Sequence, residues 1–249
     1  MARNTDIFHT PSDQSVGIWR YLDFTKFAAM LEVAGIFFSR ADLLGDPFEG
    51  SYSKANEKIR SETYKDLLPE GFDVDKLSIT FSAFSKWVRQ WIYISCWHIN
   101  NHESASMWKL YTKSNEAVAI KSKFVSLKNL LPGNVHFGKV RYVDYKREWM
   151  PEGNFLYPFV HKRKSFEHEN ELRAIILDEI PSEGDQINMK KRNVITGVTI
   201  SVDLSALIDE IYVAPSSPDW FRELVKNVSG RYGLNKPVIQ SSLDETPFF

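Results

Sequence analysis

The feature that most constrains the fold is a run of alternating charged residues directly before an apolar segment. Glu169, Glu171 and Arg173 stand at every second position, and an Ala-Ile-Ile-Leu run follows. In a strand these three side chains would share one face, and Leu172 would lie on the other. Because carboxylates resist desolvation, such a face must line a site or be paired. The stretch therefore predicts either a ligand site or a wet sheet face on which Arg173 neutralises a glutamate.

Length and composition set the frame for the domain organisation. A chain of 249 residues, 43% of them hydrophobic, is long enough to bury one substantial core. We expect a single domain over residues 1–249, with a helical insertion at about residues 46–90. The formal net charge of -1 gives no global attraction to nucleic acid or to an anionic membrane.

The cysteine count and the N-terminus bear on the compartment. Cys96 is the only cysteine, which excludes an intramolecular disulfide and a cysteine-cluster metal site. The N-terminus lacks the apolar stretch of a secretory signal, and no apolar window is long enough for a membrane span. We therefore expect a cytoplasmic protein with no membrane partner.

The hydrophobic periodicity predicts an α+β fold of mixed, largely antiparallel sheets with interspersed helices. The predicted strands are Gly17–Leu22, Ile36–Arg40, Trp91–Trp97, Glu116–Ile120, Val135–Val143, Glu171–Leu177, Val194–Val202, Ile211–Val213 and Val238–Ser241. The predicted helices are Asp23–Val33 with Gly35 as its stop, Lys54–Leu68, Phe81–Gln90, Glu103–Tyr111, Phe124–Leu131, Leu204–Asp209 and Trp220–Tyr232. His98 is expected in the polar loop after the third strand.

Arg20 is a candidate anion-binding residue. It stands between Trp19 and Tyr21 in the first predicted strand, so it points away from both aromatic neighbours. An inward guanidinium offers a fixed fork of donors to phosphate or carboxylate, whereas an outward one would be an exposed arginine packed beside aromatic rings. Both interpretations stay open. The Asp46-Pro47-Phe48-Glu49-Gly50 segment is a turn signature that we interpret as mainly structural.

Several common kinds of site are not supported. His98, His102 and His168 lack metal-ligand spacing, so no metal is expected, and His98 is instead a candidate donor or base in a substrate pocket. Neither a phosphate-binding glycine loop nor a Gly-x-Ser-x-Gly nucleophile turn is present, and Cys96 is interpreted as a packed strand residue. The basic run at residues 189–192 is interpreted as a solvated hairpin tip.

A set of motifs in a fixed order resembles a bacterial family, the domain-of-unknown-function family 2971. The resemblance runs from about Trp19 to Leu243 and implies no established activity. It rests on Trp19-Arg20-Tyr21, Asp46-Pro47-Phe48-Glu49, Ser95-Cys96-Trp97, Glu103-Ser104-x-x-Met107-Trp108-x-x-Tyr111, Lys162-x-x-x-Phe166-x-x-Glu169-x-Glu171-x-Arg173 and Val213-Ala214-Pro215.

A looser resemblance connects the chain with the ADP-ribosyltransferases. In that family an arginine on an early strand, a serine on a middle strand and a Glu-x-Glu on a later strand occur in this order. Arg20, Ser95 and Glu169-Asn170-Glu171 match it here, although Cys96 and Trp97 replace the usual Thr-Ser after the serine. The resemblance implies an ADP-ribosyltransferase-like core and NAD as a substrate.

The resemblance also implies the roles of individual residues. Glu171 would be the catalytic carboxylate that stabilises the oxocarbenium-like transition state as nicotinamide departs, and Glu169 would orient or deprotonate the acceptor. The residues expected to contact NAD are Arg20, Tyr21, Ser95, Trp97, His98, Trp108, Tyr111 and Arg173.

The acceptor would be an unknown protein or nucleic acid, and a bacterial toxin or defence effector with a neutralising partner protein would fit the same family. Two alternatives stay open beside this enzyme. One is a noncatalytic, defence-associated binding protein, and the other is a nuclease or hydrolase that uses the same carboxylates.

Overall fold

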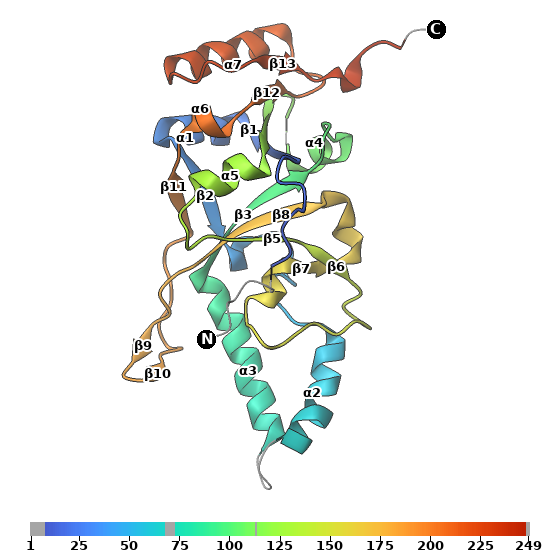
Figure 1. The fold of residues 1–249 in the computed structure, drawn as a ribbon, viewed down its shortest axis with the longest axis vertical. Helices are drawn as coiled ribbons and strands as arrows, with labels where there is room; N and C mark the ends of the chain where they lie inside the picture. The colour runs from blue at the N-terminus through green and yellow to red at the C-terminus, as the bar shows by residue number, and fades with distance from the viewer. Residues whose placement is uncertain (1–7, 68–72, 113, 248–249) are drawn as a thin grey trace.

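The computed structural model describes residues 8–67, 73–112 and 114–247. They form a mixed α/β fold with a largely antiparallel open sheet, as the sequence predicts, and several helices pack around it (Figure 1). The main sheet contains β1 (Gly17–Asp23), β2 (Gly35–Arg40), β3 (Ile92–Ile99), β4 (Ala117–Lys123), β5 (His136–Lys139), β8 (Glu171–Leu177), β11 (Gly197–Ser201), β12 (Glu210–Val213) and β13 (Val238–Gln240). The helices are α1 (Phe24–Val33), α2 (Lys54–Leu67), α3 (Val74–Val88), α4 (Ala105–Tyr111), α5 (Phe124–Leu130), α6 (Leu204–Leu207) and α7 (Asp219–Arg231).

Strand β3 is the point at which the sheet divides. One edge of β3 pairs with β8 from Ile92 to His98. The other edge is shared, because β2 pairs with Tyr93 and Ile94 whereas β1 pairs with His98 and Ile99. Between these two short pairings, residues 95–97 of β3 have no strand on that edge. Strands β1 and β2 therefore part from each other and leave an opening beside the middle of β3.

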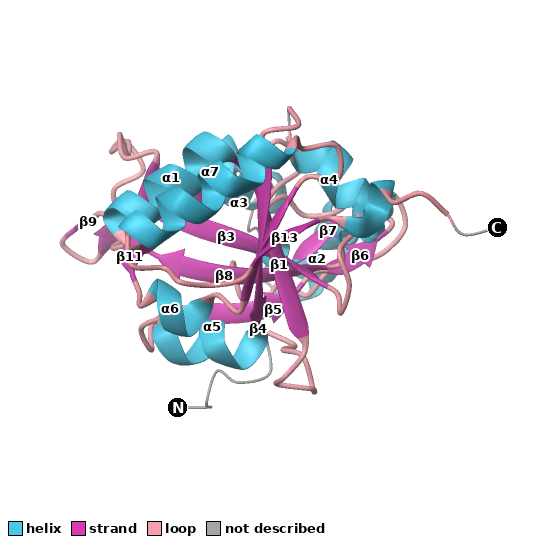
Figure 2. Ribbon diagram, turned by 90° about the horizontal axis from the view of Figure 1, so that it is seen from above, coloured by secondary structure: helices cyan, strands magenta, loops and turns pink. Residues whose placement is uncertain are grey.

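The two branches continue in opposite directions. Strand β1 pairs with β4 along its whole length, and β4 leads to β12 and β13. Strand β2 leads to β11. Figure 2 shows α1 and α7 on one side of β3 and β8, and α5 and α6 on the other. The largest core cluster joins these helices to the strands through side chains such as Phe27, Leu127 and Phe221.

Helices α2 and α3 project as a hairpin from the end of the molecule opposite α7 (Figure 1). A second apolar cluster at the hairpin's base packs Trp87 and Val88 of α3 against Ile92 and Ile94 of β3 and against Phe159. Helix α3 begins seven residues before the predicted start, because the Asp73 side chain accepts a hydrogen bond from the Lys76 amide and caps it. Leu68, the predicted end of α2, lies outside the described residues. None of the described helices combines the length and the apolar character that a bilayer crossing needs.

The prediction that His98 lies in a loop is wrong. Strand β3 extends to Ile99 because His98 has a strand partner on each side, Trp19 of β1 and Glu171 of β8. The polar residues after Trp97 predicted a loop, but strand pairing on both edges satisfies the backbone hydrogen-bonding groups of His98 and keeps the chain extended.

The single strand predicted over Val135–Val143 is also wrong, since the segment divides into β5 and β6 (Arg141–Val143). Strand β5 pairs with β8 up to Leu172, and β6 instead pairs in parallel with β7 (His161–Arg163). The reason lies in Asn170, whose φ of 36° turns the chain so that β8 begins only at Glu171. Beyond that residue β5 has no strand to pair with.

Gly35 does not end α1 as predicted. Ala34 takes the left-handed conformation, with a φ of 45°, and its amide donates to the Leu31 and Met30 carbonyls. Gly35 already belongs to β2, where a β-carbon would meet the Ile200 carbonyl oxygen at 2.8 Å. The glycine is therefore explained by the close approach of β11.

The β9 (Ser182–Glu183) and β10 (Gln186–Ile187) strands form an exposed hairpin, and the basic run follows it. The strand predicted over Val194–Val202 is shorter than expected, since only Gly197–Ser201 pairs with β2.

Candidate active site

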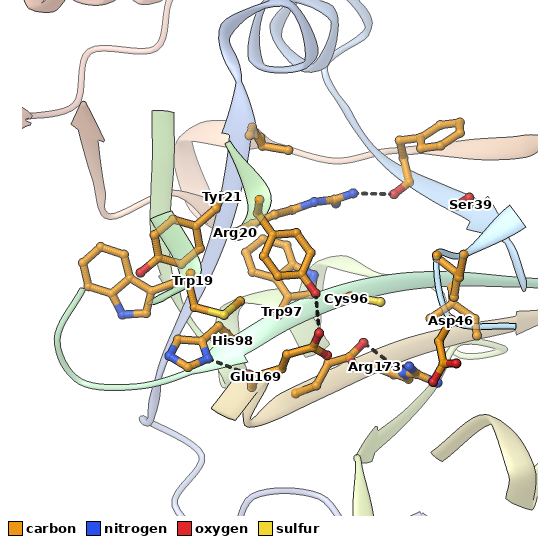
Figure 3. A pocket seen from close by; sticks show the side chains of 18 of the residues that line it. Trp19, Arg20, Tyr21, Ser39, Asp46, Cys96, Trp97, His98, Glu169 and Arg173 are labelled. Carbon is orange, nitrogen blue, oxygen red and sulfur yellow. Dashed lines mark hydrogen bonds and ion pairs between the residues drawn. The ribbon is translucent and has the colours of Figure 1, made fainter. Parts of the chain in front are cut away.

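A cavity of about 410 Å³ opens where β1 and β2 part. Its walls come from both of these strands, from β3, from α4 and from the start of β8 (Figure 3). Of the residues that the sequence singled out, it is lined by Arg20, Tyr21, Trp97, His98, Tyr111, Glu169, Glu171 and Arg173. The structure thus brings together eight side chains from four separate segments of the chain, in a volume typical of small-molecule sites.

Arg20 bridges the opening between the parted strands. Its Nη1 donates to the Ser95 Oγ of β3 at 2.9 Å, and its Nη2 donates to the Phe37 carbonyl oxygen of β2 at 2.8 Å. The guanidinium carbon lies 5.7 Å from the centre of the Trp97 ring. These contacts hold the guanidinium at the cavity wall, where three of its five N–H donors remain for another acceptor.

No described carboxylate forms an ion pair with Arg20. Burial lowers the pKa of Arg20 to about 10, which leaves the side chain charged at neutral pH. A charged group in such a position gains most from an anionic ligand that replaces the water it has lost.

The opposite wall is a buried ion-pair cluster built on Arg173. This fully buried guanidinium donates from Nη1 and Nη2 to the two Glu49 carboxylate oxygens, each at 2.8 Å. It also donates from Nε to Glu171 Oε1 at 2.9 Å and from Nη1 to the Phe159 carbonyl oxygen at 2.8 Å. Glu49, in the turn that was interpreted as mainly structural, is therefore part of the cavity wall.

Lys162 extends this cluster along the wall. Its Nζ pairs with the Glu169 carboxylate and lies 3.5 Å from Glu171 Oε2. The Tyr111 hydroxyl donates to Glu169 Oε1 at 3.0 Å. Glu49, Glu169 and Glu171 thus place three carboxylates against two cations, so this wall carries an excess of negative charge. Figure 3 shows Arg20 on one side of Trp97 and Glu169 on the other.

Glu171 is held in its ionised form. Burial raises its pKa, but the charges of Arg173 and Lys162 more than offset this and hold the pKa at about 2, below the ordinary 4.5. A carboxylate of this kind is a permanent negative charge at neutral pH and a poor proton acceptor. Cys96, whose register partner on β8 is Arg173, has a raised pKa because of burial and the nearby Glu171, so it stays a protonated, packed residue.

The low pKa of Glu171 predicts an acid-dependent loss of stability. Because its pKa is lower in the folded than in the unfolded state, the stabilisation is complete above about pH 4.5 and is lost as the pH falls towards about 2. Urea midpoints across this window should fall steeply for the wild type and less steeply for Glu171→Gln. Equal slopes for the two proteins would contradict the assignment of this ion pair.

His98 positions the Glu169 segment. Its Nδ1 lies 2.6 Å from the Glu169 carbonyl oxygen, which can only accept, so Nδ1 carries the proton and Nε2 is left as an acceptor. Burial lowers the pKa of His98, and the ring is therefore neutral at pH 7. His98 was predicted as a substrate donor or base. In the structure its ring lines the cavity and supports the carboxylate wall through the Glu169 backbone.

Two of the predicted contact residues do not line the cavity. Ser95 is buried at the edge of β3 that faces the opening, and its hydroxyl accepts from Arg20 Nη1. It reaches the site only through Arg20. Trp108 is buried behind Tyr21, with ring centres 5.0 Å apart, and its Nε1 donates to Glu103.

Glu169 also departs from the predicted alternation. It lies in a short 3₁₀ turn, Lys164–Glu169, and not on the strand. The left-handed Asn170 between the turn and β8 brings the Glu169 carboxylate back beside Glu171. The two carboxylates therefore meet through a turn and a shared lysine.

Sequence reasoning gave no role to Lys162 or Glu49. Lys162 begins the motif that contains Glu169 and Glu171, and this shared motif was the one sequence feature that could have indicated their ion pair. Glu49 pairs with a residue 124 positions away, which no local pattern reveals. No group of three or more histidine, cysteine or acidic side chains in the described part of the chain is arranged to hold a metal ion.

The chain was compared with protein-family models, with curated proteins and with solved structures. None of them matches. Both family resemblances therefore stay predictions, and the case for a function rests on the geometry of the cavity.

Proposed function

We propose that the protein is an NAD-dependent ADP-ribosyltransferase whose active site is the cavity between β1 and β2. The observation that carries this proposal is the opposite charge imbalance of its two walls. Arg20 presents a cation that has no carboxylate partner among the described residues, and the Glu49–Glu171–Glu169 wall presents an unbalanced negative charge.

NAD has the matching distribution of charge. Its diphosphate is anionic, and a guanidinium is well suited to bind it. Its nicotinamide ring is cationic and suits the carboxylate wall. Tyr21, Trp97 and Tyr111 line the space between the two walls and offer aromatic surfaces on which the rings can stack.

The chemistry follows from the ionised state of Glu171. The bond between ribose C1′ and the nicotinamide nitrogen breaks, nicotinamide leaves with the electron pair, and positive charge develops on the ribose. A fixed carboxylate stabilises that charge in a site with little water. The acceptor nucleophile then bonds to C1′, and Glu169, which has a hydroxyl and an ammonium partner, would take its proton.

Calorimetric titration of NAD, with nicotinamide release followed by chromatography, tests the proposal directly. Binding together with release supports it. Binding without release favours the noncatalytic alternative, for which one observation speaks: both Glu171 oxygens already accept from Arg173, and Oε2 also lies near Lys162. If NAD does not bind and no nicotinamide is released, with or without candidate acceptors, the proposal is rejected.

The binding role of Arg20 gives a separate prediction. Arg20→Gln should weaken NAD binding about 10- to 100-fold, because charge-assisted hydrogen bonds to the diphosphate are lost. The matched control is Arg231→Gln, an exposed position on α7, which should leave the NAD affinity unchanged. An equal affinity for the Arg20→Gln variant and the wild type would show that the diphosphate lies elsewhere.

A further inference from the structure

A second cavity, of about 510 Å³, lies at the base of the α2–α3 hairpin. It is bounded by the first half of α2, the second half of α3 and the segment 48–54 that leads into α2. That segment separates it from the first cavity, since Asp46 and Glu49 line one and Phe48 and Gly50 line the other. The proposed catalysis uses none of the side chains of this second cavity.

Arg60 is fixed in the wall of this cavity by contacts on two sides. Its Nε donates to Glu152 Oε1 at 2.8 Å. Its guanidinium carbon lies 4.0 Å from the centre of the Phe81 ring and 4.8 Å from that of Tyr52. The side chain is 7% exposed, and its Nη2 is buried without a hydrogen-bond partner. These contacts fix one positive charge in the cavity wall.

The other charges around this cavity are mostly positive. Lys54, Lys86 and Arg89 line it, and none of the three forms an ion pair with another described residue. Arg89 Nε is also buried without a hydrogen-bond partner. Glu57 is the carboxylate among the described lining residues, and serine hydroxyls such as Ser85 provide further donors.

We infer that this second cavity is a binding site for phosphate groups, separate from the proposed active site. Two guanidinium groups, two lysines and several hydroxyls, against one carboxylate among the described lining residues, match the several acceptor oxygens and the double charge of a phosphate. A free pyrophosphate and the backbone of a single-stranded nucleic acid present the same chemistry. The site would hold either ligand through its phosphates, without reading a base.

The test uses the full chain with two probes, pyrophosphate in a thermal-shift measurement and a labelled single-stranded oligonucleotide in fluorescence anisotropy. The variants are Lys86→Gln and the double variant Lys86→Gln/Arg89→Gln. The matched control is Lys190→Gln/Lys191→Gln, which removes two cations outside the cavity. Lys86 is exposed, so its substitution leaves the fold intact even where the double variant loses stability.

At least one probe should bind the wild type and the control with equal affinity. Its affinity for Lys86→Gln should be about tenfold lower, and its affinity for the double variant lower still. Binding of pyrophosphate alone would identify a free phosphate ligand, and binding of the oligonucleotide alone would identify a nucleic-acid backbone. The inference is overturned if neither probe binds at millimolar concentration, or if the cavity variants bind as tightly as the wild type. NAD titration of the same variants should be unchanged, so this result is independent of the proposed function.

Discussion

Replacing Arg173 with methionine is expected to lower the free energy of unfolding by about 3–5 kcal/mol. The guanidinium is fully buried and pairs with both Glu49 and Glu171. Methionine fills much of the same volume but leaves two carboxylates in the interior without their main cation. The cost of an uncompensated buried charge then dominates, and it far exceeds the value of any one hydrogen bond that is lost.

Urea unfolding at neutral pH measures this effect. The control is Arg222→Met on α7, where the partner Asp219 is 89% exposed and the N–O distance is 3.4 Å. A surface pair of this kind contributes little, so the control should stay within about 0.5 kcal/mol of the wild type. A loss below about 1 kcal/mol for Arg173→Met would mean that the two glutamates do not depend on this residue. A triple variant that also carries Glu49→Gln and Glu171→Gln should recover part of the loss.

The local parts of this site could be predicted from the sequence. Period-two alternation correctly sends Arg173 and Glu171 to one face and Leu172 and Ala174 to the core. The same alternation turns Arg20 away from Trp19 and Tyr21. These predictions depend only on strand geometry, which a short window of sequence contains.

Other parts depend on the path of the chain in space. The opening beside β3 exists because β1 and β2 share one edge of that strand, and no local pattern states which strands pair. Ser95 matches the motif in sequence, but the Arg20 guanidinium covers its hydroxyl, a contact between residues 75 positions apart.

The second large effect is expected on turnover. Glu171→Gln should reduce nicotinamide release about 100- to 1,000-fold while NAD still binds, because the variant removes a charge that stabilises the transition state and leaves Arg20 untouched. The control is Glu210→Gln, a partly exposed carboxylate paired with Lys121 at 2.8 Å, which should keep the wild-type rate. Release at an undiminished rate from Glu171→Gln would reject Glu171 as the catalytic residue and leave Glu169 as the carboxylate to test.

The two variants differ in what they leave behind, and this separates catalysis from stability. Removing Arg173 leaves two carboxylates without their cation, whereas removing the Glu171 charge leaves every cation with a partner: Arg173 keeps Glu49, and Lys162 keeps Glu169. Three carboxylates against two cations become two against two, so the Glu171→Gln protein should fold. A site that carries one more negative charge than its own cations require is matched to a ligand that supplies the missing positive charge. In bound NAD this charge lies on the nicotinamide ring, and it moves onto the ribose as the C1′–N bond breaks. Because Glu171 is proposed to stabilise the charge on the ribose, we expect Glu171→Gln to affect the rate more than the affinity.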